Sequence, residues 1–382
     1  MEAIAATPLG DHPPSPWQDL PPELLGLVIQ RVPSHASRVR AVCRSWRAGA
    51  RLHPPLRPLL PWLTLCDGRS LSLPDGELHR IRIPDDISRI MSTGGMLFIV
   101  HSDGRCSLAN PFSHNTAPQQ VHANCFRHEV SPDSPPVCNL RKVVVMADHI
   151  VTIREGRSHG HGEVLSIRDQ RQPSRAVNIQ WTPPLHIPAH VLDITLFQEK
   201  LHVLVGIGTL YILAIHLYVM DTIGGGDGKH VNLRRILVAN EEQNYIRTSC
   251  YLVASGDRLL MVKQMGMFNG SFIRFLRSAW FEVFEAADLS SGCGQWKKVD
   301  RLMGRALFVS QGCSESLPTG DQYGGAQQDC IYFLSNSKID TLPGHFSGIY
   351  NMRLGTLSPL LFETLVAHDG PGTTSWLFPV YT

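Results

Sequence analysis

The sequence predicts a mainly β fold, a β-propeller of six or seven blades, preceded by a small all-α module. The 382 residues include 32 glycines and 27 prolines, which favours many turns and short strands over long helices. Apolar residues make up 43% of the chain and charged residues 18%, so the chain can bury a sizeable core. Short apolar runs recur along residues 56–382, whereas residues 17–55 follow a helical period. We expect residues 1–16 to form a disordered tail.

The first predicted helix begins at Leu20-Pro21-Pro22. Prolines at this place can start a helix without losing a hydrogen bond, and Glu23 puts a negative charge near the helix N-terminus, where the dipole favours it. Pro33 ends the pattern, because a proline disfavours helical backbone in the residue before it. One face of this helix is apolar and consists of Leu24, Leu25, Val28, Ile29 and Val32.

A second apolar stripe follows at Val39, Val42, Cys43 and Trp46, with the helical spacing i, i+3, i+4 and i+7. It predicts a second helix, which Gly49 is placed to end. Two or three short helices in about forty residues cannot bury enough surface to be stable alone. The module must therefore dock, either on the rest of the chain as a helical cap or on another protein.

Two residue patterns in this module are specific. The first is Trp17-x-x-Leu20-Pro21-x-Glu23-Leu24-Leu25-x-x-Val28-Ile29-x-Arg31-Val32-Pro33, and the second is Arg38-Val39-Arg40-Ala41-Val42-Cys43-Arg44-Ser45-Trp46-Arg47. Together, near the N-terminus, they resemble an F-box. The resemblance implies docking on a Skp-type adaptor and, through it, on the cullin of a ubiquitin ligase. It points to an apolar docking and helix-packing set that comprises Leu20, Pro21, Leu24, Leu25, Ile29, Val39, Val42, Cys43 and Trp46.

The remainder of the chain repeats one pattern. Apolar runs begin near Met96, Asp148, Leu201, Leu259 and Ala306, which puts roughly 50 residues between neighbours, the period of kelch-type propeller blades. A further run, Ile331-Tyr332-Phe333-Leu334, comes too early and breaks the period. A kelch-like β-propeller is the first interpretation, and an irregular pair of β-sandwiches is the alternative.

The C-terminal half also has a family pattern. It is carried by Phe281-Glu282-Val283-Phe284-Glu285, Ala306-Leu307-Phe308-Val309, Gly312-Cys313-Ser314-Glu315-Ser316, Asp329-Cys330-Ile331-Tyr332-Phe333-Leu334 and Ile349-Tyr350-Asn351-Met352-Arg353. These segments resemble the C-terminal domain of unknown function that follows the F-box in a large plant family. The resemblance implies a kelch-like propeller that recognises a target protein.

No segment carries a recognisable catalytic, cofactor or metal site. Residues 224–229 are glycine-rich, but His230 stands where a phosphate-binding loop needs Ser or Thr. His159 and His161 lack the further ligands of a zinc site at the usual spacing, and no Gly-x-Ser-x-Gly elbow occurs. We therefore expect a non-catalytic chain without cofactor or metal. An enzyme whose propeller channel holds a metal or a small molecule is kept as an alternative.

Charge and cysteine content bear on partners and compartment. The net charge of +2 gives no bulk attraction to nucleic acid or to a membrane surface, and neither partner is expected. Residues 201–220 carry no formal charge, but the Gly-Ile-Gly at 206–208 splits them into a β-hairpin rather than a membrane helix. Nine cysteines without a Cys-x-x-Cys pair indicate a reducing compartment, the cytoplasm, the nucleus or both.

These features together predict the substrate-recognition subunit of an SCF-type (Skp-cullin-F-box) ubiquitin ligase. The F-box would dock on the adaptor and the propeller would bind an unknown protein target for ubiquitination. The link through residues 34–37 is shorter than an F-box usually has. A non-ligase interaction scaffold, which recruits targets but no adaptor, is therefore a further alternative.

Overall fold

The computed structural model describes part of the chain in detail. The described residues are 16–31, 39, 41–52, 60–64, 69–73, 78–81, 86–111, 119–121, 140–154, 164–169, 176–179, 189–208, 212–223, 230–240, 246–266, 279–289, 294–320, 326–336, 345–360 and 375–378. The chain divides into two compact units, Met1–Leu59 and Leu60–Thr382. The sequence placed this boundary after residue 55. The N-terminal tail, up to residue 15, lies outside the described residues.

The first unit, the helical unit, contains the 3-10 helix η1 (Pro16–Asp19) and the α-helices α1 (Pro22–Arg31) and α3 (Arg44–Leu52). Helix α1 corresponds to the first helix that the sequence predicts. Pro22 is its first residue, where a proline costs no helical hydrogen bond, and the Leu25 amide already donates to the Pro21 carbonyl at 3.0 Å.

The second predicted helix is helical at Val39 and Ala41, as expected, but it is interrupted at Val42 and Cys43, and its predicted end is wrong. Helix α3 begins only at Arg44, because Cys43 caps it: the Trp46 amide donates to the Cys43 Sγ atom at 3.4 Å and the Arg47 amide to the Cys43 carbonyl at 3.0 Å. Gly49 lies inside α3 rather than ending it. A Cβ atom on Gly49 would stand 2.8 Å from the Leu25 Cδ2 atom, so glycine there allows α1 and α3 to pack closely.

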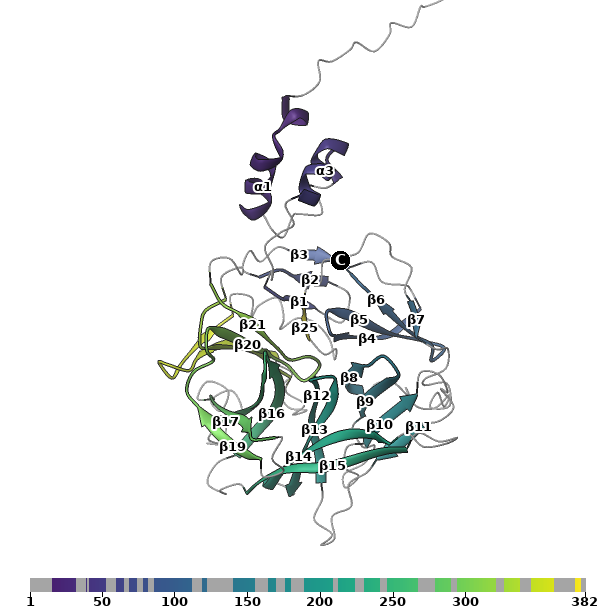
Figure 1. The fold of residues 1–382 in the computed structure, drawn as a ribbon, viewed down its shortest axis with the longest axis vertical. Coiled ribbons are helices and arrows are strands. Elements are labelled where there is room, and N and C mark those ends of the chain that lie inside the picture. Colours follow the sequence, from purple (N-terminus) through teal and green to yellow (C-terminus); the bar gives the residue numbers. More distant parts are fainter. Residues whose placement is uncertain are drawn as a thin grey trace, which may run out of the picture. The chain divides into compact units, whose positions relative to one another are not determined.

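The second unit is a mainly β propeller of six blades, numbered here from the blade that holds β1 (Figure 1). Blade 1 contains β25 (Ser375–Leu377), β1 (Trp62–Thr64), β2 (Arg69–Leu71) and β3 (Leu78–Arg80). Blade 2 contains β4 (Ile87–Thr93), β5 (Met96–His101), β6 (Cys106–Ala109) and β7 (Gln119–Val121). Blade 3 contains β8 (Leu140–Val145), β9 (His149–Arg154), β10 (Val164–Asp169) and β11 (Ala176–Ile179).

The other three blades complete the ring. Blade 4 contains β12 (Ala189–Phe197), β13 (Lys200–Gly208), β14 (Ile212–Ile223) and β15 (His230–Asn240). Blade 5 contains β16 (Ile246–Ser255), β17 (Arg258–Gly266), β18 (Trp280–Ala287) and β19 (Gln295–Val299). Blade 6 has five strands, in the order β21 (Glu315–Pro318), β20 (Arg305–Val309), β22 (Cys330–Asn336), β23 (His345–Asn351) and β24 (Thr356–Pro359). The prediction of a propeller is confirmed, and the alternative of paired sandwiches is wrong.

The repeat marks the second strand of five blades and misses blade 1. The runs that the sequence identified near residues 96, 148, 201 and 259 form β5, β9, β13 and β17, each the second strand of its sheet. The run at Ala306 forms β20, again the second strand of its sheet, and the run at Ile331, which breaks the period, forms β22, the third strand of the same sheet. The cause is an inserted strand: β21 forms a hairpin with β20, so β20 and β22 run parallel.

The ring closes through a short strand from the other end of the chain. Strand β25 pairs antiparallel with β1, with Trp376 opposite Leu63. This pairing joins the beginning and the end of the propeller within blade 1, where β25 covers the edge of β1. The Trp376 indole is fully buried and donates to the Val309 carbonyl of blade 6 at 3.1 Å, so the closing strand also anchors the neighbouring blade.

The core of the propeller lies between the blades. Phe98 and Val100 of β5 pack towards blade 3, while Leu97 and Ile99 of the same strand pack towards blade 1. Successive side chains of a strand point to opposite faces of the sheet. Both faces are covered here, so the inner strands are continuous apolar runs instead of alternating ones. The uncharged segment at 201–220 belongs to β13 and β14, and no described helix is long and apolar enough to cross a membrane.

Gly348 of β23 marks a place where two strands approach too closely for a side chain. A Cβ atom there would stand 2.9 Å from the Phe333 ring and 3.0 Å from the Ser358 carbonyl oxygen. We expect Gly348→Ala to lower the free energy of unfolding by about 1–3 kcal/mol, because the fully buried Phe333 cannot move away freely. Urea unfolding measures this loss. The penalty should shrink in a Phe333→Leu background, and an equal penalty in both backgrounds would contradict the steric cause.

Candidate functional site

The helical unit has its own small core. Leu25 and Ile29 of α1 pack with Val39 and with Ala50 of α3, and all four side chains are buried. Leu20 and Trp46 are partly buried and pack against this cluster. The Trp46 indole also donates to the Trp17 carbonyl at 2.6 Å, which ties η1 to α3. Part of the predicted docking set therefore holds the helices to one another. These residues are Leu20, Leu25, Ile29, Val39 and Trp46.

The other face of α1 is apolar and exposed. Leu24 is 48% exposed, Leu27 50% and Val28 37%, and the spacing of three and four residues puts them on one stripe of the helix. Val42, which precedes α3, is 60% exposed. We call Leu24, Leu27, Val28 and Val42 the exposed apolar set. A group of large apolar side chains left in water on a small unit is typical of an interaction site.

The other two residues of the predicted docking set are Pro21 and Cys43, and they also differ in exposure. Pro21 is exposed and Cys43 is half-buried. Hydrogen bonds with the Ser45 hydroxyl and from the Trp46 amide lower the pKa of the Cys43 thiol. Leu27 is absent from the predicted set although it belongs to the exposed apolar set. Its position three residues after Leu24 is the signal that would have found it.

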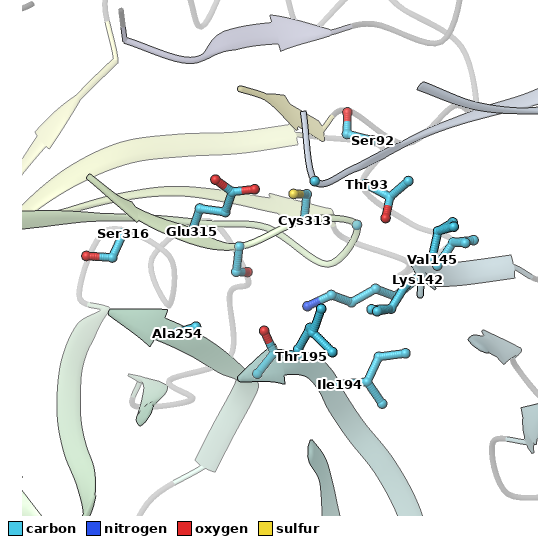
Figure 2. A pocket seen from close by; sticks show the side chains of 16 residues that line it. Ser92, Thr93, Lys142, Val145, Ile194, Thr195, Ala254, Cys313, Glu315 and Ser316 are labelled. Carbon is cyan, nitrogen blue, oxygen red and sulfur yellow. The ribbon is translucent and has the colours of Figure 1, made fainter. Parts of the chain in front are cut away.

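A second candidate site is a cavity of about 280 Å³ in the centre of the propeller. Its wall comes from the first strands of four blades, β4, β8, β12 and β16, and from β21 with the turn before it. Figure 2 shows Lys142 and Thr195 on one side of this cavity and Glu315 and Cys313 on the other. Convergence of inner strands on one cavity is the usual place for a propeller channel.

Lys142, which lines this cavity, forms a buried ion pair with Asp193 of β12, which is not itself a lining residue. The Lys142 ammonium lies 2.7 Å from the Asp193 Oδ1 atom, and both side chains are 5% exposed. Asp193 also accepts the backbone N–H groups of Ile194 at 2.8 Å and of Leu252 at 2.7 Å. One carboxylate therefore connects β8, β12 and β16. Arg141 adds a second link between β8 and β12, because its guanidinium donates to the carbonyls of Val191 and Leu192.

Glu315 faces the same cavity from the start of β21. Burial raises the pKa of its carboxyl group to about 7, and the nearby positive charge of Lys142 opposes that rise. Among the described residues, none forms a hydrogen bond or an ion pair with the Glu315 side chain. Burial also raises the pKa of the neighbouring Cys313 thiol. The cavity wall thus carries one ammonium group, which Asp193 neutralises, and one carboxyl group without a partner among the described residues.

Asp193 is the residue in the sequence that signals this buried network. Asp193 interrupts the apolar strand Val191-Leu192-Asp193-Ile194, and a charge within such a strand must find a partner. The sites that we did weigh, residues 224–229 and the pair His159 and His161, lie outside the described residues. Within the described ranges, no three His, Cys, Asp or Glu side chains gather as metal ligands would.

Comparison with solved structures finds only distant likenesses. The β-propeller domain of Myceliophteria thermophila Cps50 (Swd1) is 12% identical over 78% of each chain, with a TM-score of 0.36. An exo-beta-1,3-galactanase of Phanerochaete chrysosporium is 9% identical over 78% of this chain and 66% of its own, with a TM-score of 0.37. An alpha-L-arabinofuranosidase of Lactobacillus brevis is 9% identical over 76% of this chain and 88% of its own, with a TM-score of 0.32. Likenesses at this level carry no information on function.

Comparison with protein families gives a specific result. No curated protein matches the sequence significantly. The family model described as the KIB1-4 beta-propeller matches residues 70–351, which include all strands from β3 to β23 and most of the propeller unit. The match covers well over half of the chain and coincides with the six-bladed unit seen in the structure. The chain therefore belongs to the KIB1-4 beta-propeller family.

Proposed function

We propose that the chain is the substrate-recognition subunit of an SCF-type ubiquitin ligase. The helical unit docks on a Skp-type adaptor, which connects it to a cullin, and the propeller binds the target protein. The exposed apolar set carries this proposal. It lies on a unit whose sequence resembles an F-box and which is compact separately from the propeller.

The division of the apolar residues within the helical unit supports docking. Leu25 and Ile29 are buried between α1 and α3, where they hold the two helices together and are not available to a partner. The exposed face of α1 carries Leu24, Leu27 and Val28, which do not pack within the unit's core. A partner that covers them gains apolar contact without having to unfold the unit, and an apolar helix face laid into a groove is a common mode of recognition.

The chain needs no catalytic residue in this role. A conjugating enzyme held elsewhere in the complex transfers ubiquitin, and this subunit raises the local concentration of the target. Such a subunit works in the cytoplasm, the nucleus or both. Loops between the propeller strands are the expected target surface, because loops on a rigid scaffold carry most binding residues.

The test is adaptor binding by a variant with charge in the exposed apolar set. We expect Leu24→Asp with Val42→Asp to weaken binding to a purified Skp-type adaptor at least a hundredfold. Each of these side chains would contribute about 2 kcal/mol to the binding free energy, as buried anchor residues of an interface do. Leu25 is unsuitable for this purpose, because it is only 1% exposed and a charge there would unfold the helical unit. Titration calorimetry with the full chain measures the affinity.

A matched control places the same charges on the propeller. Met303 and Leu354 are 74% and 72% exposed, and Met303→Asp with Leu354→Asp should leave adaptor binding unchanged. Equal binding by the wild type and the Leu24, Val42 variant would contradict the docking surface. No binding by the wild type would contradict the ligase role and favour the non-ligase scaffold.

A further inference from the structure

We propose that the central cavity of the propeller binds a small organic cation, a primary ammonium or a guanidinium group on a short alkyl chain, through the carboxylate of Glu315. This site is separate from the helical unit and does not depend on adaptor docking. Its lining combines one carboxylate, the ammonium group of Lys142, which Asp193 neutralises, several hydroxyl groups and apolar side chains.

The charges around the cavity favour a positively charged ligand over a negative one. Lys142 and Asp193 neutralise each other at 2.7 Å, and Asp193 accepts two further backbone hydrogen bonds, so neither is available to a ligand without breaking this network. Glu315 remains, with no hydrogen bond or ion pair from the described residues. The ionised cavity thus carries one uncompensated negative charge. A buried charge without a partner is costly, and a bound cation removes that cost.

The other lining groups fit the rest of such a ligand. Ser316 is engaged by Ser255 at 2.8 Å and by the Arg305 guanidinium at 2.7 Å, so it holds β21 in place. The hydroxyl groups of Thr93 and Thr195 line the cavity and can accept hydrogen bonds from an ammonium group (Figure 2). Val145 and Ile194 supply apolar surface for the alkyl stem.

The size of the cavity limits the ligand. Its volume of about 280 Å³ equals the space of roughly nine water molecules, at about 30 Å³ each. This is at the lower end of small-molecule sites, which span about 300–1,000 Å³. A ligand with a single charged group and a stem of a few carbons therefore fits, and a drug-sized molecule does not.

Binding must also depend on pH. Only the ionised form of Glu315 attracts a cation, and burial raises the pKa of this group to about 7. The charged or titratable groups around it are Lys142 from β8, Asp193 from β12, Arg305 from β20 and Cys313 from the turn before β21. The lining residues of β4 and β16 are not titratable. An alkyl ammonium stays protonated up to a pH of about 10, so Glu315 controls the pH dependence.

The experiment titrates the full chain with butylammonium chloride, and with butan-1-ol and sodium butyrate as neutral and anionic counterparts of the same length. We expect saturable binding of one butylammonium, and none of the other two compounds. Raising the pH from 6 to 8 should strengthen binding about tenfold, because the ionised fraction of a carboxyl group with a pKa near 7 rises by that factor. Binding of butyrate in preference to butylammonium would overturn the proposal.

The variant Glu315→Gln keeps the shape of the side chain and removes its charge. It should weaken butylammonium binding roughly tenfold to a hundredfold and abolish the pH dependence. Glu282→Gln, which alters an exposed pair with Lys298 at 2.6 Å, is the matched control and should bind as the wild type does. Unchanged affinity in Glu315→Gln would overturn the proposal, and the pH series of the wild type tests it even if this variant fails to fold.

The cation can come from a free amine or from a lysine side chain of another protein. Nα-acetyl-lysine amide presents the same ammonium group on a backbone. If it binds as well as butylammonium, the channel accepts a protein side chain, and if only butylammonium binds, the channel takes a free small amine. Both results support the cation site and assign its source.

Discussion

Trp376→Ala is expected to lower the free energy of unfolding of the propeller by about 4–5 kcal/mol. The indole is fully buried, and it packs edge-on against Phe308 with ring centroids 5.5 Å apart. Removing it leaves a large cavity in the cluster between blades 1 and 6 and deprives the Val309 carbonyl of its donor. Because β25 closes the ring with only three residues, this side chain is its main anchor. Urea unfolding, followed by intrinsic fluorescence and by circular dichroism, measures the loss.

The variant Trp376→Phe separates packing from hydrogen bonding. It keeps an aromatic ring in the cluster and loses the N–H donor, so we expect a smaller loss of about 1–2 kcal/mol. A loss below 1 kcal/mol in Trp376→Ala would show that the closure of the ring does not depend on this anchor.

Asp193→Ala is expected to cost about 3–5 kcal/mol, the second largest effect of a single change. The substitution leaves the buried Lys142 ammonium without a counter-charge and removes the acceptor of two backbone N–H groups. These bonds connect three blades at the centre of the propeller, so the loss should appear in global unfolding rather than in one blade. Urea unfolding of the purified variant measures it.

A double substitution tests the cause. Lys142→Met removes the unpaired charge, so Lys142→Met with Asp193→Ala should be more stable than Asp193→Ala alone. The exposed pair of Glu282 and Lys298 is the matched control, and Glu282→Ala should cost less than about 1 kcal/mol. If Asp193→Ala is no more costly than Glu282→Ala, the buried pair does not stabilise the centre of the propeller.

The body of the propeller could be predicted because its inner strands are buried on both faces. Runs such as Met96-Leu97-Phe98-Ile99-Val100 are continuous and recur at a near-constant period. The closure of the ring could not be predicted in this way. Strands β1 and β25 have three residues each and lie at opposite ends of the unit, so neither shows a period. The extra strand of blade 6 could not be predicted for the same reason, since β21 has only four residues.

The sequence predicted the docking surface only as one set of residues, in which exposed side chains and side chains buried between the helices were not separated. Leu24 and Leu25 are neighbours on one apolar helix, and periodicity alone does not reveal which of them faces α3. The close approach of Gly49 to Leu25 shows that Leu25 is the residue that faces α3. This approach joins two residues that are far apart in the sequence, so periodicity does not reveal it. The channel was missed because Lys142, Asp193 and Glu315 come from different blades. A single sequence does not show which inner strands meet.

Amide hydrogen exchange of the full chain, with and without a Skp-type adaptor, tests the ligase role most directly. The proposed role predicts that exchange slows in α1 and in the segment around Val42, where the exposed apolar set lies, and is unchanged in the propeller strands. Protection confined to the propeller, or no protection anywhere at saturating adaptor, would contradict it.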